Sequence, residues 1–177
     1  MRYKRGVPSL EALLASVLEW AQRDENVLAL IVTGSTARTD GRRDEFSDLD
    51  VELIARDPRR LLDDDAWFKA FGGVWVAMRF DELDHPTRLV VYEGGFKVDF
   101  TVAGVRRLEE MTERLDPLYE GGYRVLVDKA GLASGLPAAS GAFRPHATPL
   151  QNEFDAVVEE FWFEATHLPG CGTSCGS

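Results

Sequence analysis

The chain has 177 residues, of which 45% are hydrophobic and 28% are charged, and its formal net charge is −10. This composition is typical of a globular protein with one ordinary domain, or one domain plus the start of another, and the acidic balance argues against a nucleic-acid partner and favours a small cationic one. Because no apolar run reaches the roughly 20 residues of a membrane helix and no signal-peptide segment stands at the start, we expect a cytoplasmic protein without a membrane partner.

The first part of the chain predicts a helix and then a buried strand. Ser9 can cap a helix over residues 10–21, whose apolar side chains recur at helical spacing. Residues 27–32 form a continuous apolar run, which is typical of a strand covered on both faces. Gly34 and Ser35 follow at once. A small pair after such a strand lets backbone N–H groups approach an anion, although a lone Gly-Ser is more often an ordinary strand-to-helix turn.

Residues 47–55 alternate between apolar and acidic side chains, so Asp48, Asp50 and Glu52 share one face of a predicted strand. Two carboxylates on one strand face, close to a phosphate-binding turn, are what two magnesium ions bridging a nucleoside triphosphate require. An ordinary amphipathic strand with a hydrated acidic face would show the same pattern.

The next segment predicts a helix and a strand. Residues 59–71 have apolar positions that suit one helix, with Asp63, Asp64 and Asp65 as its solvated surface. Gly72 and Gly73 end that helix, and residues 74–80 are expected to form a strand.

Residues 87–92 and 96–102 read as two arms of a hairpin around a glycine-containing turn. In the second arm Asp99 shares the polar face with Lys97 and Thr101. If this strand pairs beside the strand that bears Asp48 and Asp50, the three carboxylates converge.

The last third of the chain predicts a charged helix over 105–115, a strand over 123–128 and an apolar helix over 150–167 that Asn152 can cap. Lys129, after the strand, is either a phosphate contact or a surface lysine. Cys171 and Cys175, near His167, do not complete the ligand set of a structural zinc site. We expect four segments, a domain over 1–130, a Gly/Ala/Ser/Pro-rich linker over 131–149, the helix over 150–167 and an irregular tail over 168–177.

The combination of Gly34-Ser35, Asp48-x-Asp50 and a later Asp99 resembles the DNA polymerase β-like nucleotidyltransferases. Within that superfamily the chain resembles the aminoglycoside 6-adenylyltransferases, the streptomycin-modifying resistance enzymes. The resemblance rests on the segments VTGSTARTDGRRDEFSDLDVEL, YEGGFKVDFTV, GYRVLVDKAGL and NEFDAVVEEFWFEATH. It implies an α+β fold, with a mixed sheet flanked by helices, followed by a helical domain.

The resemblance also implies a reaction, the transfer of AMP from ATP to a hydroxyl of streptomycin, by a monomer or weak dimer that needs two magnesium ions. By motif position Gly34 and Ser35 would hold the β and γ phosphates, with Arg38 and Lys129 as further phosphate contacts. Asp48 and Asp50 would bind magnesium, and Asp99 would bind the catalytic metal or take the proton from the attacking hydroxyl. Three glutamates of the last helix, Glu153, Glu160 and Glu164, could pair with the streptomycin guanidinium groups, or simply form a solvated face.

The chain departs from the family pattern at its end. The family's helical domain continues beyond the EFWFEATH segment, whereas a Pro/Gly/Cys/Ser segment follows here, so the acceptor site is expected to be incomplete. Two other functions therefore compete with the first. One is a minimal nucleotidyltransferase of toxin–antitoxin type that modifies a protein or RNA, and the other is a remnant that binds nucleotide without transferring it.

Overall fold

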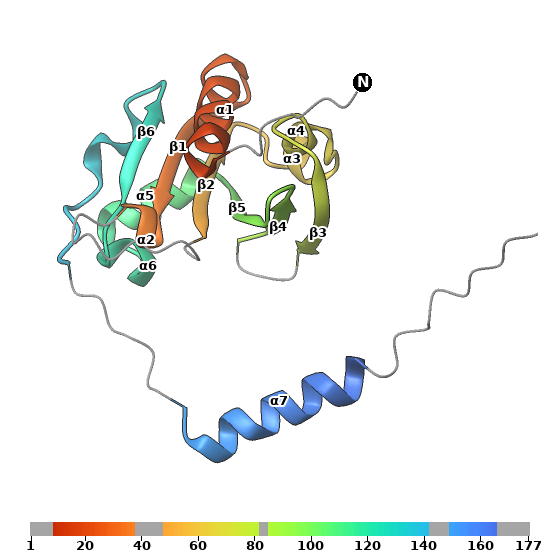
Figure 1. Cartoon of the computed structure of the whole chain (residues 1–177). Helices are drawn as coiled ribbons and strands as arrows, with labels where there is room; N and C mark the ends of the chain where they lie inside the picture. The colour runs from red at the N-terminus through yellow and green to blue at the C-terminus, as the bar shows by residue number, and fades with distance from the viewer. Residues whose placement is uncertain (1–8, 38–47, 82–84, 142–148, 166–177) are drawn as a thin grey trace, which may run out of the picture. The chain divides into compact units, whose positions relative to one another are not determined.

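The computed structural model describes residues 9–37, 48–81, 85–141 and 149–165. The chain divides into two units, Met1–Phe143 and Arg144–Ser177. The first unit contains a six-stranded sheet with helices, and the described residues of the second, 149–165, contain one helix (Figure 1).

The sheet of the first unit is mixed, with the strand order β3-β4-β5-β2-β1-β6. Only β2 and β5 pair in parallel, and every other neighbouring pair is antiparallel. This architecture confirms the predicted α+β fold with a mixed sheet. The strands are β1 (Val27–Thr33), β2 (Leu49–Ala55), β3 (Val74–Phe80), β4 (Thr87–Tyr92), β5 (Phe96–Gly104) and β6 (Arg124–Asp128).

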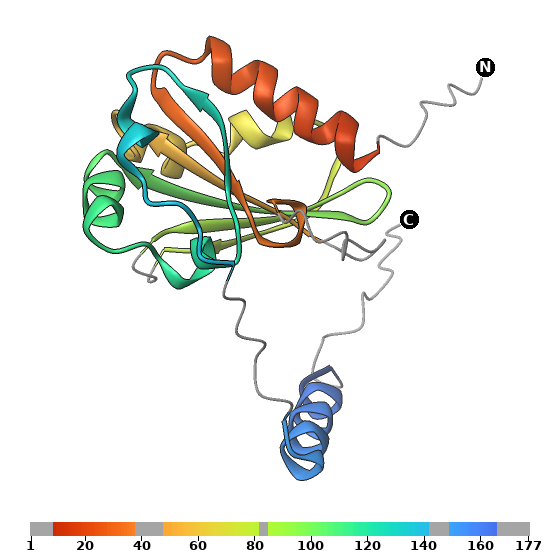
Figure 2. The ribbon, with the colours of Figure 1, turned by 90° about the vertical axis from the view of Figure 1, so that its left-hand side faces the viewer.

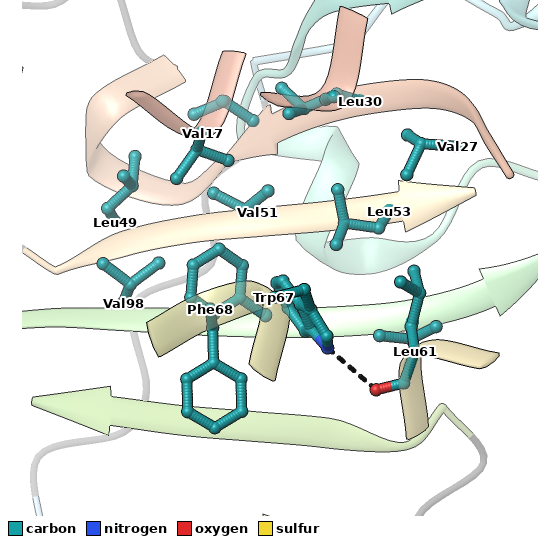
Figure 3. Packing of buried hydrophobic residues seen from close by; sticks show 14 of the residues in the cluster. Val17, Val27, Leu30, Leu49, Val51, Leu53, Leu61, Trp67, Phe68 and Val98 are labelled. Carbon is teal, nitrogen blue, oxygen red and sulfur yellow. Dashed lines mark hydrogen bonds between the residues drawn. The ribbon is translucent and has the colours of Figure 1, made fainter. Parts of the chain in front are cut away.

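The larger part of the core lies on the sheet face covered by α1 (Leu10–Arg23), α3 (Arg59–Leu62) and α4 (Ala66–Lys69). Ser9 caps α1 as predicted, because its hydroxyl accepts a hydrogen bond from the Ala12 N–H. Figure 2 shows α1 running along this face, and Figure 3 shows Trp67 among the buried side chains, with its indole N–H donating to the Leu61 carbonyl. Apolar side chains of β2, at Leu49, Val51 and Leu53, point into this layer.

The opposite face is covered by α5 (Arg106–Glu113), α6 (Pro117–Glu120) and the 3-10 helix η1 (Leu132–Gly135). Ile31 and Ile54 of the sheet pack there against Leu108 and Met111. Ala133 of η1 is buried in the same cluster, so the first unit does not end at residue 130. The predicted linker over 131–149 therefore begins too early, since a short apolar turn within it completes the core.

The segment 59–71 is not the single helix that its apolar spacing predicts. It forms α3 and α4, separated at Asp63–Asp65. The Asp64 carboxylate accepts a hydrogen bond from the Ala66 N–H, and such a local side-chain bond competes with helix continuation. Asp65 is not simply solvated, since it forms an ion pair with Arg79 and faces the buried Arg88.

The second unit contains α7 (Gln151–Ala165). This helix begins before Asn152, and the Leu150 N–H donates to the Glu153 carboxylate, so Glu153 rather than Asn152 stabilises its start. Its apolar side chains, among them Phe154, Phe161 and Trp162, are exposed in the structure. No helix within the described ranges is long and apolar enough to cross a membrane.

Two tryptophans offer a matched test of this packing. Trp67 is 9% exposed and stacks on Trp20, whereas Trp75 on the edge strand β3 is 61% exposed. We expect Trp67→Ala to lower the free energy of unfolding by about 3–5 kcal/mol and Trp75→Ala to change it by less than about 0.5 kcal/mol. Urea unfolding followed by circular dichroism measures both changes, and equal losses would contradict the described core.

Candidate functional site

Four of the predicted site residues, Gly34, Asp48, Asp50 and Asp99, meet where β1, β2 and β5 lie side by side. The parallel pairing of β2 with β5 places Asp50 directly opposite Asp99, and Thr33 at the end of β1 lies opposite Asp50 from the other side. Because strand side chains alternate, Asp48 and Lys97, two positions before this pair, lie on the same face. The register thus gathers three carboxylates and one ammonium on one sheet face.

Gly34 is the residue that closes this corner of the sheet. It follows β1 directly and has a φ of 65°, a conformation that favours glycine. A Cβ atom at this position would overlap the Asp50 carboxylate. The first turn of α2 (Gly34–Ala37) is also tied to β2, because the Thr36 hydroxyl donates to the Asp48 carbonyl at 3.2 Å. A side chain at position 34 is therefore incompatible with the observed place of Asp50.

Lys97 joins two of the carboxylates. Its Nζ lies 2.7 Å from Asp48 Oδ2 and 3.3 Å from Asp99 Oδ2. The hydrogen bond to Asp48 raises the pKa of Lys97 above its ordinary value, so the ammonium stays charged at neutral pH. The sequence placed Lys97 beside Asp99 on the polar strand face but gave it no role. Its position two residues before Asp99 is the signal that could have assigned it to the site.

The Asp99 carboxylate is more enclosed than that of Asp48, with 23% against 40% of the side chain exposed. Its Oδ1 atom is buried and, among the residues described, has no hydrogen-bond partner. Burial raises the pKa of Asp99, and the nearby Lys97 ammonium offsets only part of this rise. A carboxylate with a raised pKa is a stronger base than an ordinary aspartate. Asp99 is therefore chemically suited to accept a proton or to complete the shell of a cation.

A buried polar network continues from the carboxylates along β2. Glu52, two positions after Asp50 on the same face, accepts hydrogen bonds from Arg107 Nε at 2.9 Å and from the Tyr119 hydroxyl at 2.7 Å. Arg107 also pairs with Asp116, at 2.8 Å. Burial raises the pKa of Tyr119, which keeps its hydroxyl protonated as a donor. The network fixes α5 and α6 to the strand, and the sequence did not reveal it because its members are far apart along the chain.

The donor set fits a divalent cation. Hard cations such as magnesium take carboxylate oxygens, and the buried Oδ1 of Asp99 is an acceptor that lacks a hydrogen-bond donor among the described residues. Within the described part of the chain, no three acidic, His or Cys side chains already enclose a metal position. The Lys97 ammonium contacts both Asp48 and Asp99.

Lys129, predicted as either a phosphate contact or a surface lysine, does not lie beside Gly34. Its backbone N–H donates to the Leu28 carbonyl and its Nζ donates to the Asp24 carbonyl, at the start of β1. Gly34 follows the other end of this strand, roughly 20 Å away along the extended chain. The antiparallel pairing of β6 with β1 is what carries Lys129 away from the site.

The other predicted contacts lie outside the described residues or belong to the second unit. Arg38 lies outside the described residues, as does the side chain of Ser35. Glu153, Glu160 and Glu164 belong to α7 in the second unit, where Glu153 bonds to the helix start and Glu160 is exposed. Their roles remain predictions.

The chain is similar to known proteins in its fold and in its sequence family. A solved aminoglycoside 6-adenyltransferase from Bacillus subtilis shares the fold, with a TM-score of 0.50 and 18% identity over 92% of this chain and 55% of that chain. A family model described as streptomycin adenylyltransferase, a class of nucleotidyltransferases, matches residues 8–171. The chain therefore belongs to the streptomycin adenylyltransferase family.

Two curated relatives are both aminoglycoside 6-adenylyltransferases. The protein from Bacillus subtilis (strain 168) is 23% identical over 90% of this chain and 58% of its own length. The protein from Campylobacter jejuni is 22% identical over 86% of this chain and 54% of its own length. The chain thus spans a little over half the length of the curated relatives it matches.

Gly34 and Gly131 provide a matched test of the close contact between Gly34 and Asp50. Both have positive φ angles, 65° and 68°, but a Cβ at Gly131 would meet nothing within 4 Å. We expect Gly131→Ala to cost about 1–2 kcal/mol from backbone strain alone, and Gly34→Ala to cost clearly more because it also displaces Asp50. Chemical denaturation of the two variants measures the difference. Equal costs would show that Gly34 and Asp50 are not in close contact.

The pH dependence of stability at Asp116 tests the buried network that joins Glu52, Arg107 and Asp116. Burial on its own would raise the pKa of Asp116, but hydrogen bonds from the Leu118 N–H and from Arg107 outweigh burial and hold the pKa below its ordinary value. A lowered pKa in the folded state gives stability that is present above the unfolded pKa of about 3.9 and is lost as the pH falls through the folded value. Asparagine keeps the helix cap, so Asp116→Asn removes mainly the charge pair.

We expect Asp116→Asn to lower the stability by about 1 kcal/mol at pH 7, and we expect this difference to shrink as the pH falls below about 4. Urea titrations of wild type and variant across this range measure it. A difference that stays constant down to pH 2 would mean that the Asp116 charge contributes nothing.

Proposed function

We propose that this chain carries the nucleotide half of an aminoglycoside nucleotidyltransferase site, and that its reaction is the transfer of AMP from ATP to a hydroxyl of streptomycin. The observation that carries the proposal is the pairing of Asp50 with Asp99 beside Gly34. Membership of the streptomycin adenylyltransferase family supports the choice of an aminoglycoside as acceptor. The use of ATP implies that the reaction takes place in the cytoplasm.

Asp48, Asp50 and Asp99 would hold magnesium, for which two ions are expected. When bound, magnesium neutralises the charge of the triphosphate and of the departing pyrophosphate. Gly34 and Ser35 would face the β and γ phosphates with their backbone N–H groups. The residues of the chain thereby orient the α-phosphorus toward the acceptor.

The chemical step is a displacement at the α-phosphorus. The acceptor hydroxyl oxygen forms a bond to this phosphorus, the bond to the bridging oxygen of the β-phosphate breaks, and pyrophosphate leaves with that electron pair. The hydroxyl proton goes to the carboxylate of Asp99.

The acceptor is a cation, and acidic side chains are the groups that recognise it. Glu153, Glu160 and Glu164 on α7 are proposed to pair with the streptomycin guanidinium groups, in line with the net charge of −10. This assignment depends on the second unit and is independent of the carboxylates on the sheet.

Asp99→Asn tests the proposed role of this carboxylate. We expect the variant to lose AMP transfer by at least about 100-fold, because the amide cannot accept the proton, while it keeps most of its affinity for ATP. Mass spectrometry of streptomycin after incubation with ATP and magnesium measures the adduct, and a pyrophosphate assay measures turnover. Asp64→Asn is the matched control, since Asp64 lies between α3 and α4 and an asparagine can still accept from the Ala66 N–H.

The outcomes separate the competing functions. Transfer by wild type and by Asp64→Asn but not by Asp99→Asn supports the proposal. Magnesium-dependent ATP binding without an adduct would limit the function of this chain to nucleotide binding, and AMP found on a protein or RNA would favour a minimal nucleotidyltransferase. An Asp99→Asn variant as active as wild type would overturn the role of Asp99.

A further inference from the structure

Lys97 has a position that the proposed reaction does not require. Its ammonium is shared by Asp48 and Asp99, two of the carboxylates proposed to hold magnesium, at 2.7 and 3.3 Å. A magnesium ion would approach the same oxygens to about 2.0–2.1 Å. The ammonium and the ion therefore compete for the same oxygen atoms.

The register makes this competition a property of the fold. Lys97 precedes Asp99 by two positions on β5, and Asp48 precedes Asp50 by two positions beside β2, so the pairing of Asp50 with Asp99 also sets Lys97 opposite Asp48. The backbone at position 97 therefore lies next to the carboxylates whenever β2 and β5 pair in this register. Lys97 offsets the mutual repulsion of carboxylates that the strand pairing forces together.

The Lys97 ammonium, which contacts both Asp48 and Asp99, is an incomplete substitute for a metal ion. Lys97 satisfies Asp99 Oδ2, but Asp99 Oδ1 stays buried without a hydrogen-bond donor among the described residues. The Lys97 side chain is 37% exposed, so it can swing into solvent without disturbing the core. An ion that carries two charges and takes several oxygen ligands would satisfy the carboxylates better.

We propose that the Lys97 ammonium is an internal counter-ion of the metal site. It occupies the site when metal is absent and competes there with free divalent cations. It leaves the site when the metal arrives with a nucleotide. This inference rests on the proposed function, since it takes Asp48 and Asp99 as metal ligands. Once displaced, the ammonium lies next to the bound polyphosphate, which is a favourable place for a positive charge. The site therefore binds metal weakly alone and more tightly together with ATP.

Direct metal titration tests this inference without any measurement of activity. Mn²⁺, which reports its own binding by electron paramagnetic resonance, is titrated into wild type, Lys97→Met and Lys97→Arg, each with and without ATP. Without ATP we expect Lys97→Met to bind Mn²⁺ about tenfold more tightly than wild type, because a unit charge next to the ion has been removed. Lys97→Arg, which keeps the charge, should stay within about threefold of wild type.

Lys69→Met on α4 is the control, because Lys69 is exposed and lies on the layer that covers the other sheet face. Lys97→Gln replaces Lys97→Met if methionine lowers the folded fraction seen by circular dichroism. Equal or weaker Mn²⁺ binding by the neutral variants would overturn the counter-ion role, while Mn²⁺ binding by wild type with ATP would leave the proposed function in place. Absence of Mn²⁺ binding by every protein, with ATP present, would overturn both.

Discussion

The parallel pairing of β2 with β5 is the constraint on which the rest of the site depends. These strands are separated in sequence by β3, β4 and their connections, yet their register puts Asp50 opposite Asp99. A shift by one residue would turn the carboxylates of one strand to the apolar face, where Leu49, Val51 and Leu53 pack. The core of α1, α3 and α4 therefore fixes the register, and the register fixes the site.

The polar face of β2 shows how environment assigns different tasks to similar side chains. Asp48, at the start of the strand, is 40% exposed and shares the Lys97 ammonium with Asp99. Glu52, further along, is 4% exposed and has permanent partners in Arg107 and Tyr119. A carboxylate held by a buried arginine and a phenol is a structural element, whereas carboxylates held by one partly exposed lysine can exchange that partner for another cation.

The alternation of residues 47–55 and the hairpin around Gly94 were sufficient to predict the strands and the polar face of Asp99, because these patterns are local. The resemblance to the adenylyltransferases supplied the family. The sequence could not exclude Lys129, since only the antiparallel pairing of β6 with β1 carries it to the far end of the sheet. The sequence also did not predict the Glu52 network or the contact of Lys97 with Asp48. These contacts join residues about fifty positions apart. Long-range register, and not local propensity, decides such contacts.

The proposed metal site is built from two strands that are distant in sequence, β2 and β5. Iron-mediated backbone cleavage tests this arrangement: Fe²⁺ takes the place of magnesium in the presence of ATP, and hydroxyl radicals generated with ascorbate and peroxide cut the chain next to the ion. We expect cleavage near Asp48 to Asp50 and near Lys97 to Asp99 in the same protein, with both sets of fragments suppressed by excess magnesium. Cleavage confined to one of these strands, or cleavage elsewhere that magnesium does not suppress, would contradict it.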